Sequence, residues 1–270
     1  MENNSLLDVQ HLSHMFHLKR KMTVKAIDDV SFQIKKGEIY GLVGESGSGK
    51  STVARCIMNI YKPSEGEIFY KGIPICKSKE FRKNRKMLQM TRQMIFQNSA
   101  SSVNPRMKIG DIVAEPLRIY SGKGRPGKKE IEKQLELVGL DRSYMEKYPC
   151  ELSGGQRQRV AIARALSTKP ELIVADEPIA SLDVSIQAQM VNLFRKLQKE
   201  QGFSFLFIAH DLSMVEFLCD RTGVMYHGKL VEEGRTQDIF AHPEHEYTKA
   251  LLAAVPIPDP RIERQKGEVL

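Results

Sequence analysis

The sequence predicts an α/β fold built around a largely parallel sheet. Apolar runs of strand length alternate along the chain with stretches in which apolar residues recur at helical spacing. Buried strands are predicted at residues 39–43, 172–175 and 203–209, and a predicted helix follows each of them. Because parallel strands need helical crossovers, this alternation favours a parallel sheet covered by helices.

The first half of the chain changes from strand to helix periodicity around Lys50. Residues 26–34 alternate between apolar and polar side chains, which is typical of a strand with one buried face. After Lys50 the apolar side chains recur at helical spacing instead. We expect, in order, strands at 26–34 and 39–43, a helix from 50 to about 62, a hairpin at 64–75 around Gly66 and Gly72, a basic helix at 77–92 and a strand at 94–96.

The second half contains longer periodic segments that are separated by Gly, Pro and Lys. No internal repeat is present, and each motif described below occurs once. We expect a surface loop at 120–129, a helix at 131–137 that stops at Gly139, a helix at 156–167 that ends before Pro170, a strand at 172–175, a helix at 186–201, a strand at 203–209 and a last helix at 212–218.

Composition excludes several classes of protein. Hydrophobic residues make up 41% and charged residues 27%, as in a folded globular chain and unlike a disordered or collagen-like one. The net charge of +8 indicates an anionic partner, which by charge alone is a nucleotide, a nucleic acid or a membrane surface. No apolar run approaches the roughly 18 residues of a transmembrane helix. The first residues also lack the basic start and apolar run of a signal peptide.

Cysteine and histidine spacing gives little support for a metal site. No two cysteines form a Cys-x-x-Cys pair, so we expect reduced thiols rather than a disulfide framework or a zinc site. His11, His14 and His17 recur at every third residue, but a strand would place them on alternating faces and no acidic residue lies among them. Metal binding by these histidines is the less favoured alternative. The cysteines are Cys56, Cys76, Cys150 and Cys219.

A glycine-rich loop follows the strand at 39–43 and precedes the predicted helix. It fits the pattern G-x-x-x-x-G-K-[ST], in which backbone N–H groups and a helix N-terminus surround phosphate groups. We expect Lys50 to hold the β- and γ-phosphates and Ser51 to bind Mg²⁺. The loop consists of Gly44, Glu45, Ser46, Gly47, Ser48, Gly49, Lys50, Ser51 and Thr52.

Two adjacent carboxylates end the buried strand at 172–175. Asp176 and Glu177 are costly at the end of an apolar strand unless a cation or a polar ligand meets them. We therefore expect Asp176 to bind Mg²⁺. Glu177 is the candidate general base that polarises the attacking water.

A short motif between these two elements resembles a known family. Residues 152–156 read Leu-Ser-Gly-Gly-Gln and open the helix that precedes the Asp176 strand. A glycine-opened helix N-terminus suits an anion. With this pentapeptide the chain resembles the nucleotide-binding subunit of an ABC transporter. The resemblance implies that the anion is the γ-phosphate of an ATP held by the opposite subunit, bound by Ser153, Gly154, Gly155 and Gln156.

Further residues acquire a role only through this resemblance. Gln97 matches the glutamine that senses Mg²⁺ and the water and relays to the membrane subunit. Asp183 is the acidic residue of the dimer-contact loop, and His210 matches the histidine that contacts the γ-phosphate. Phe16 stands where the family places an aromatic residue that stacks on adenine, although a core position is the other interpretation.

The resemblance covers nearly the whole chain and narrows to the oligopeptide/dipeptide (and nickel) importer ATPases, through residues 97–106 and 242–252. It implies a P-loop, RecA-like core with a mainly parallel sheet, an antiparallel β subdomain and a helical subdomain. We expect a single nucleotide-binding domain over 1–270. Its parts would be a core at about 1–97 and 165–235, a helical subdomain at about 98–164 and a tail at 236–270.

The implied activity is ATP hydrolysis with Mg²⁺ that drives import of peptides or a related solute. The implied partners are a second ATPase subunit (a paralogue rather than an identical copy), two integral permease subunits and, indirectly, an extracytoplasmic solute-binding protein. The chain would then be peripheral, on the cytoplasmic face of the membrane.

The sequence departs from the family pattern at two points. Two other activities are alternatives to the expected one. The contact loop reads Ala-Ser-Leu-Asp at 180–183 where Ser-Ala-Leu-Asp is commoner, and the absence of cysteine after Cys219 predicts no iron–sulfur cluster. The net charge leaves open an ABC-type ATPase that acts on nucleic acid or ribosomes, although tandem cassettes and zinc cysteines are missing and no nucleic-acid partner is expected. A small-molecule kinase would leave the pentapeptide unexplained.

Overall fold

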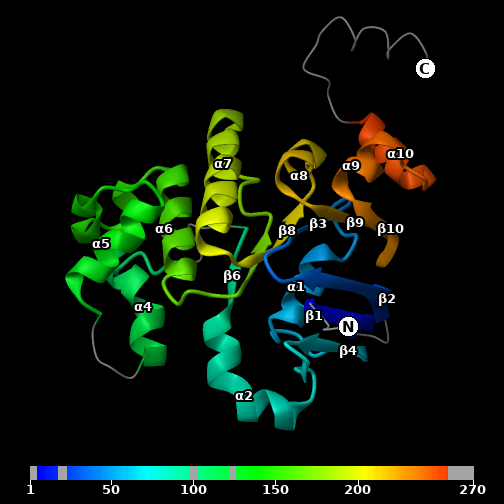
Figure 1. Ribbon diagram of the computed structural model, residues 1–270, viewed down its shortest axis with the longest axis horizontal. Coiled ribbons are helices and arrows are strands. Elements are labelled where there is room, and N and C mark those ends of the chain that lie inside the picture. The colour runs from blue at the N-terminus through cyan, green and yellow to red at the C-terminus, as the bar shows by residue number, and fades with distance from the viewer. Residues whose placement is uncertain (1–4, 18–22, 98–102, 122–125, 255–270) are drawn as a thin grey trace, which may run out of the picture.

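A six-stranded sheet forms the centre of the protein, as the computed structural model shows (Figure 1). The structure describes residues 5–17, 23–97, 103–121 and 126–254. The strand order is β10-β9-β3-β8-β7-β6, and all neighbouring pairs are parallel except β10 with β9. The predicted α/β fold with a mainly parallel sheet is confirmed. The strands are β3 (Ile39–Val43), β6 (Arg92–Ile95), β7 (Leu172–Asp176), β8 (Ser204–Ala209), β9 (Arg221–Tyr226) and β10 (Lys229–Arg235).

A second, antiparallel sheet covers one side of this core. Its order is β2-β1-β4-β5, and the two longest strands pair over most of their length. One buried cluster joins this sheet to β3 and to helix α1. The strands are β1 (Ser5–His17), β2 (Thr23–Lys35), β4 (Glu65–Tyr70) and β5 (Ile73–Pro74).

The helices lie around the central sheet in separate groups (Figure 1). Helices α4, α5 and α6 form a helical region on one side, α2 projects away from the sheet, and α9 and α10 lie beyond the edge made by β10. None of the described helices is long and apolar enough to cross a bilayer. The helices are α1 (Lys50–Ile57), α2 (Ser78–Thr91), α4 (Ile109–Ser121), α5 (Lys128–Leu137), α6 (Gly154–Leu166), α7 (Val184–Gln201), α8 (Leu212–Leu218), α9 (Thr236–Ala241) and α10 (Glu246–Ala253).

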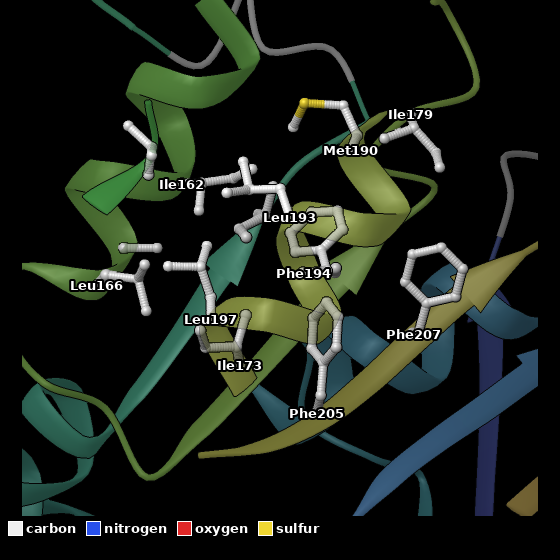
Figure 2. Packing of buried hydrophobic residues seen from close by; sticks show 14 of the residues in the cluster. Ile162, Leu166, Ile173, Ile179, Met190, Leu193, Phe194, Leu197, Phe205 and Phe207 are labelled. Atoms are coloured by element: carbon white, nitrogen blue, oxygen red, sulfur yellow. The ribbon is translucent and has the colours of Figure 1, made fainter. Parts of the chain in front are cut away.

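Helix α7 packs its apolar face on strand β8. The Phe194 ring lies 5.2 Å from that of Phe205 and 6.2 Å from that of Phe207, measured between centroids, and all three are fully buried (Figure 2). Burial of such side chains contributes roughly 1.5–3 kcal/mol each. This contact holds the strand that ends at the candidate site.

Several boundaries differ from the expectation by a few residues, and three differences change the description of the chain. Helix α1 ends at Ile57 rather than near residue 62, because Asn59 takes a left-handed conformation with φ of 57°. Gly66 lies in β4 and not in a turn; a Cβ there would lie 2.2 Å from the carbonyl oxygen of His11, so glycine permits the approach of β1. The predicted loop at 120–129 is shorter, since Tyr120 belongs to α4 and Lys128 begins α5. Residues 122–125 of that loop lie outside the described residues.

Several elements lacked a clear sequence pattern and were not expected. Helix α4 contains Pro116, a residue that normally argues against a helix interior. Strands β9 and β10 form a short hairpin around His227 and Gly228, and α9 and α10 are only six and eight residues long. Tertiary contacts support these elements: α4 packs on α6, β9 and β10 pair within the central sheet, and α10 contacts both of these strands.

Candidate functional site

The glycine-rich loop connects the end of β3 to the start of α1, as the sequence predicts. Gly44 and Gly49 have φ of 144° and 104°. A Cβ at Gly44 would lie 2.1 Å from the carbonyl oxygen of Met225, and one at Gly49 would lie 2.4 Å from that of Ala26, so both positions require glycine. The loop therefore lies against the sheet while the N-terminus of α1 faces it, which makes an anion site.

Lys50 is folded over the loop that precedes it. Its Nζ donates hydrogen bonds to the carbonyl oxygens of Gly44 (2.7 Å) and Glu45 (2.8 Å) and lies 3.4 Å from Ser48 Oγ. The side chain is buried, and burial lowers its pKa, opposed by the carboxylates of Glu177 and Asp176. The ammonium group thus lies at the centre of the loop, where phosphate charge would meet it.

Ser51 and Asp176 bring two oxygen ligands together. Ser51 Oγ donates to Asp176 Oδ1 at 2.7 Å, across the junction between α1 and the end of β7. Asp176 is buried, and burial raises its pKa against the hydrogen bond from Ser51. Neighbouring groups compensate the charge of this carboxylate only in part. The carboxylate and the Ser51 hydroxyl are therefore suitable ligands for a hard cation such as Mg²⁺.

Three polar side chains meet where three neighbouring strands end. Gln97 follows β6, Glu177 follows β7 and His210 follows β8. Gln97 Nε2 donates to Glu177 Oε2 at 2.9 Å, and His210 Nδ1 lies 3.5 Å from the same oxygen. The carboxyl ends of adjacent parallel strands meet at one edge of a sheet, which explains the cluster.

The backbone at Glu177 adopts a conformation that costs free energy. Its φ is 44°, unusual for a residue with a side chain, and its N–H donates to the carbonyl oxygen of Ile208 at 3.0 Å. Residues held this way concentrate at functional sites. The strand end is thereby turned so that Asp176 and Glu177, although adjacent, bond different partners.

The glycine-opened helix α6 begins with a capping box. Ser153 Oγ accepts from the N–H of Gln156 at 3.3 Å, and Gln156 Oε1 accepts from the N–H of Ser153 at 2.9 Å. The side chain of Gln156 also donates to Tyr144 Oη at 2.9 Å. These bonds order the helix N-terminus. Its glycines, Gly154 and Gly155, leave the backbone amides uncovered by side chains of their own.

The contact loop lies directly against these glycines. A Cβ at Gly155 would lie 2.9 Å from Ile186 Cγ2, and one at Gly154 would lie 3.4 Å from Leu182 Cδ2. Asp183 is the N-cap of α7; its carbonyl oxygen accepts from the N–H of Ile186, while its exposed side chain makes no capping bond. The structure therefore brings the pentapeptide and the contact loop together.

The phosphate loop and the pentapeptide belong to different regions of the chain. Helix α6 lies in the helical region and α1 lies behind the central strands, with β6 and α7 between them (Figure 1). Within the described ranges no hydrogen bond or ion pair joins residues 44–52 to residues 153–156. The two motifs therefore lie apart within one chain.

Phe16 lies in an aromatic cluster beside the end of α1. Its ring is half-buried, 4.6 Å from that of His14 and 5.4 Å from that of Tyr61, and Tyr61 Oη accepts from Arg55 of α1. This position does not decide between a core and a nucleotide role, and adenine stacking stays a prediction.

The histidines of β1 are dispersed. His14 is buried and stacked on Tyr61, and His11 bonds Asp29 at the surface. Over the part of the chain that the structure describes, no group of three or more His, Cys, Asp or Glu residues could hold a metal ion.

Two tyrosines at the site had no signal in the sequence. Tyr144 bonds Gln156, and Tyr247 of α10 accepts a hydrogen bond from the N–H of Glu45 at 2.9 Å. Neither lies at a diagnostic spacing from a motif, because both contacts depend on chain segments that meet only in the fold.

The fold and the site define an ATPase with a phosphate-binding loop. A glycine-rich loop lies between a parallel strand and a helix, and an acidic pair ends a nearby strand of the same sheet. The family model "ABC transporter" matches residues 27–180, and "Oligopeptide/dipeptide transporter, C-terminal region" matches residues 231–270. The chain belongs to the ABC transporter family, and its cofactors are ATP and Mg²⁺.

Curated relatives are similar over almost the whole chain. The oligopeptide transport ATP-binding protein OppF of Bacillus subtilis is 52% identical, over 97% of this chain and 86% of that protein. The dipeptide transport ATP-binding protein DppF of Lactococcus lactis is 46% identical, over 100% of this chain and 86% of that protein. An ABC-type ATPase acting on nucleic acid is not favoured by these relatives.

Solved structures confirm the fold as that of an ABC ATPase cassette. The ATP-binding cassette MJ0796, a dimer in a post-hydrolysis state bound to ADP and Pi, is 28% identical and has a TM-score of 0.75, over 85% of this chain and 98% of that one. The protein cbiO1 from Clostridium perfringens, part of the transporter complex cbiONQ, is 27% identical and has a TM-score of 0.76, over 98% of this chain and all of that one.

Proposed function

We propose that the chain is the ATP-hydrolysing subunit of an importer for oligopeptides, dipeptides or a related small solute. The observation that carries the proposal is the match to the peptide-transporter C-terminal region together with about 50% identity to peptide transport ATP-binding proteins. The ATPase motifs alone would fit any transporter of the family.

The phosphate loop binds ATP in this proposal. On ATP binding, the Lys50 ammonium group gives up its hydrogen bonds to the carbonyl oxygens of Gly44 and Glu45. It donates instead to the β- and γ-phosphates, which are stronger acceptors. The loop amides and the N-terminus of α1 supply the remaining positive charge. Phe16, near the end of α1, stacks on the adenine.

Ser51 and Asp176 hold Mg²⁺, with Gln97 as a further ligand from the neighbouring strand end. An ion held by these residues would supply positive charge beside the phosphates and would neutralise negative charge that develops during transfer. The raised pKa of Asp176 supports this assignment, since a divalent cation would stabilise the buried carboxylate that the folded chain only partly compensates.

Glu177 is the general base. Its Oε2 lies between Gln97 Nε2 and His210 Nδ1, so both neighbours can orient the carboxylate and the attacking water. The water loses its proton to Glu177 as it attacks the γ-phosphorus, and ADP leaves with the bond to the γ-phosphate broken. His210, more exposed than Glu177, contacts the γ-phosphate.

Two subunits complete each site. The half-sites within one chain are apart, so a second ATPase subunit in head-to-tail arrangement would supply Ser153–Gln156 to an ATP on Lys50. Asp183 lies beside that pentapeptide and would contact the opposite subunit. We propose pairing with a paralogous ATPase.

A groove next to Gln97 fits a segment of a membrane subunit. The groove has a volume of about 520 Å³, lies between α2 and α4, and includes the exposed apolar side chains of Ile60, Phe96 and Ile119. One of the two integral permease subunits would dock here and the other on the paralogous ATPase, and through them the chain would act with an extracytoplasmic solute-binding protein. The chain would then lie on the cytoplasmic face of the membrane.

The cationic face of α2 supports this location. Lys79, Arg82, Lys83 and Lys86 are exposed and lie on one side of the helix, opposite the buried Leu88. None of these four side chains has an ion-pair partner among the described residues. Such a face beside the groove suits the anionic cytoplasmic leaflet.

Affinity purification from gently solubilised membranes tests the proposal. Recovery of two permeases, a paralogous ATPase and an extracytoplasmic peptide-binding protein would support it, and peptide uptake should stop when the chain carries Lys50→Ala. Recovery of permeases with a binding protein for another solute would contradict the peptide assignment.

A further inference from the structure

A side chain of the C-terminal helix contacts the phosphate loop. Tyr247 Oη of α10 accepts a hydrogen bond at 2.9 Å from the backbone N–H of Glu45, 202 residues earlier in the sequence. Glu45 is the second residue of the loop and is exposed. The matched C-terminal region thus reaches the part of the chain that is proposed to hold ATP.

The tyrosine is fixed to the central sheet on two sides. Its ring stacks on Tyr226, the last residue of β9, with centroids 4.1 Å apart and ring planes 28° apart. Its own N–H donates to His245 Nδ1 at 3.1 Å. The carboxylate of Glu232, on β10, accepts from the N–H groups of Glu244 (3.0 Å) and His245 (3.1 Å), which fastens the start of α10.

The hydroxyl remains a neutral hydrogen-bonding group at neutral pH. Burial raises the pKa of Tyr247 above the ordinary tyrosine value, and the N–H of Glu45 only partly offsets this. The acceptor presented to the loop is therefore a phenol and not a phenolate.

Glu45 is held from both ends of its backbone. Tyr247 accepts from its N–H, and Lys50 Nζ donates to its carbonyl oxygen. The same carbonyl oxygen accepts from the N–H of Ser48 at 3.2 Å, and two residues beyond Glu45 the loop is open, since a Cβ at Gly47 would meet no atom within 4 Å. The tyrosine therefore restricts the part of the loop that the sheet does not support.

We propose that Tyr247 is a positioning residue for the phosphate loop, by which the C-terminal region raises the affinity for ATP. Fixing Glu45 before ATP arrives reduces the conformational freedom that the loop loses on binding. Neither Tyr247 nor Glu45 belongs to the groups that react, so their contact acts on nucleotide binding and not on the hydrolysis step. This inference rests on the proposed role of the loop in binding ATP.

Tyr247→Phe removes the hydroxyl and keeps the ring on Tyr226. Tyr226→Phe is the matched control, because it removes a hydroxyl from the other ring of the same stack and leaves the Glu45 bond intact. For a single hydrogen bond at the surface we expect Tyr247→Phe to weaken ATP binding about two- to fivefold. Its kcat should change less than about twofold, and Tyr226→Phe should match the parent in both quantities.

Amide hydrogen exchange of the full chain without nucleotide tests the contact itself. Exchange at Glu45 should be several times faster in Tyr247→Phe than in the parent and in Tyr226→Phe. Equal exchange at Glu45 in Tyr247→Phe and the parent would overturn the contact. Faster exchange with unchanged ATP affinity would overturn the effect on binding. If the parent chain bound no ATP, the proposed function would fail instead, whatever the exchange shows.

Discussion

Glu177 is the residue whose proposed role can be tested most directly. Glu177→Gln keeps the size and the hydrogen bond from Gln97 but removes the base, so ATP should still bind. General-base catalysis contributes about 10²–10⁴-fold, and we expect kcat to fall in that range. Phosphate release measures turnover. Glu171→Gln, a surface change that removes only the ion pair with Lys71, is the control. Turnover of Glu177→Gln near that of the parent would show that another group activates the water.

The buried carboxylate of Asp176 should lower the stability of the fold, although the proposed Mg²⁺ site requires it. Because burial raises its pKa, the folded chain binds a proton there more tightly than the unfolded chain. Above the raised pKa, the charged carboxylate of Asp176 therefore lowers the free energy of unfolding. This loss of stability shrinks as the pH falls through the raised pKa, and it is absent below the ordinary Asp pKa.

Asp176→Asn keeps an acceptor for Ser51 and removes that cost. The variant should have a higher Tm than the parent at pH 7, with the difference shrinking as the pH falls through the raised pKa towards the ordinary Asp value. Each kcal/mol corresponds to about 2–4 °C in a chain of this size. Thermal unfolding without Mg²⁺ measures the effect, and Mg²⁺-dependent ATP binding should be lost in the same variant. A lower Tm across the whole pH range would mean that the carboxylate stabilises the fold.

At the scale of secondary-structure elements, one aromatic cluster holds helix α7 on strand β8. Phe194→Ala leaves a cavity between the rings of Phe205 and Phe207 and should cost about 3–5 kcal/mol. Phe217→Ala removes the same group from a ring that is 52% exposed and should cost less than about 1 kcal/mol. Urea unfolding measures both. Similar losses in the two variants would show that α7 is not held by this cluster.

The sequence predicts the elements that carry a clear local pattern and misses those that do not, for a physical reason. Strands β3, β7 and β8 are fully buried, so continuous apolar runs mark them. Strand β9 depends on its pairing with β3 and β10, and helix α10 depends on its contacts with β9 and β10. Likewise, the motif at 44–52 identifies the phosphate loop because its glycines are required locally. The Tyr247 contact joins residues 202 positions apart, and no local pattern specifies it.

Roles taken from family resemblance are supported unequally by the geometry. Gln97 and His210 both meet Glu177 at the ends of adjacent strands, which their sequence positions after β6 and β8 already indicate. The pentapeptide at 152–156 lies apart from the phosphate loop. That separation cannot be derived from spacing along the chain, because it depends on where the helical region packs.

At the scale of the whole molecule, α2 presents one face of exposed cations. Replacing Lys79, Arg82, Lys83 and Lys86 by Gln should reduce binding to vesicles that contain anionic lipid. Each cation near such a surface contributes about 1 kcal/mol, so the loss of all four should weaken binding by up to about a thousandfold. Cosedimentation with mixed phosphatidylglycerol and phosphatidylcholine vesicles measures it.

The matched control removes four cations from other helices. Lys128, Lys129, Lys133 and Lys199 are exposed and lie on α5 and α7. Replacing these lysines by Gln should leave vesicle binding nearly unchanged. Equal loss in both sets would mean that net charge, and not the α2 face, governs the interaction. Parent protein that does not bind the vesicles would show that this face is turned to solvent.

The short distance along the chain between Phe96 and Gln97 has a mechanical consequence. Phe96 lines the groove between α2 and α4, and Gln97 bonds the carboxylate of Glu177. A force applied to the aromatic ring therefore reaches the reaction centre through a single peptide unit, with no intervening loop to absorb it. Strand β6 holds the other end of that unit against β7. Under the proposed function, this direct connection would link the movement of a partner segment in the groove to the timing of ATP cleavage.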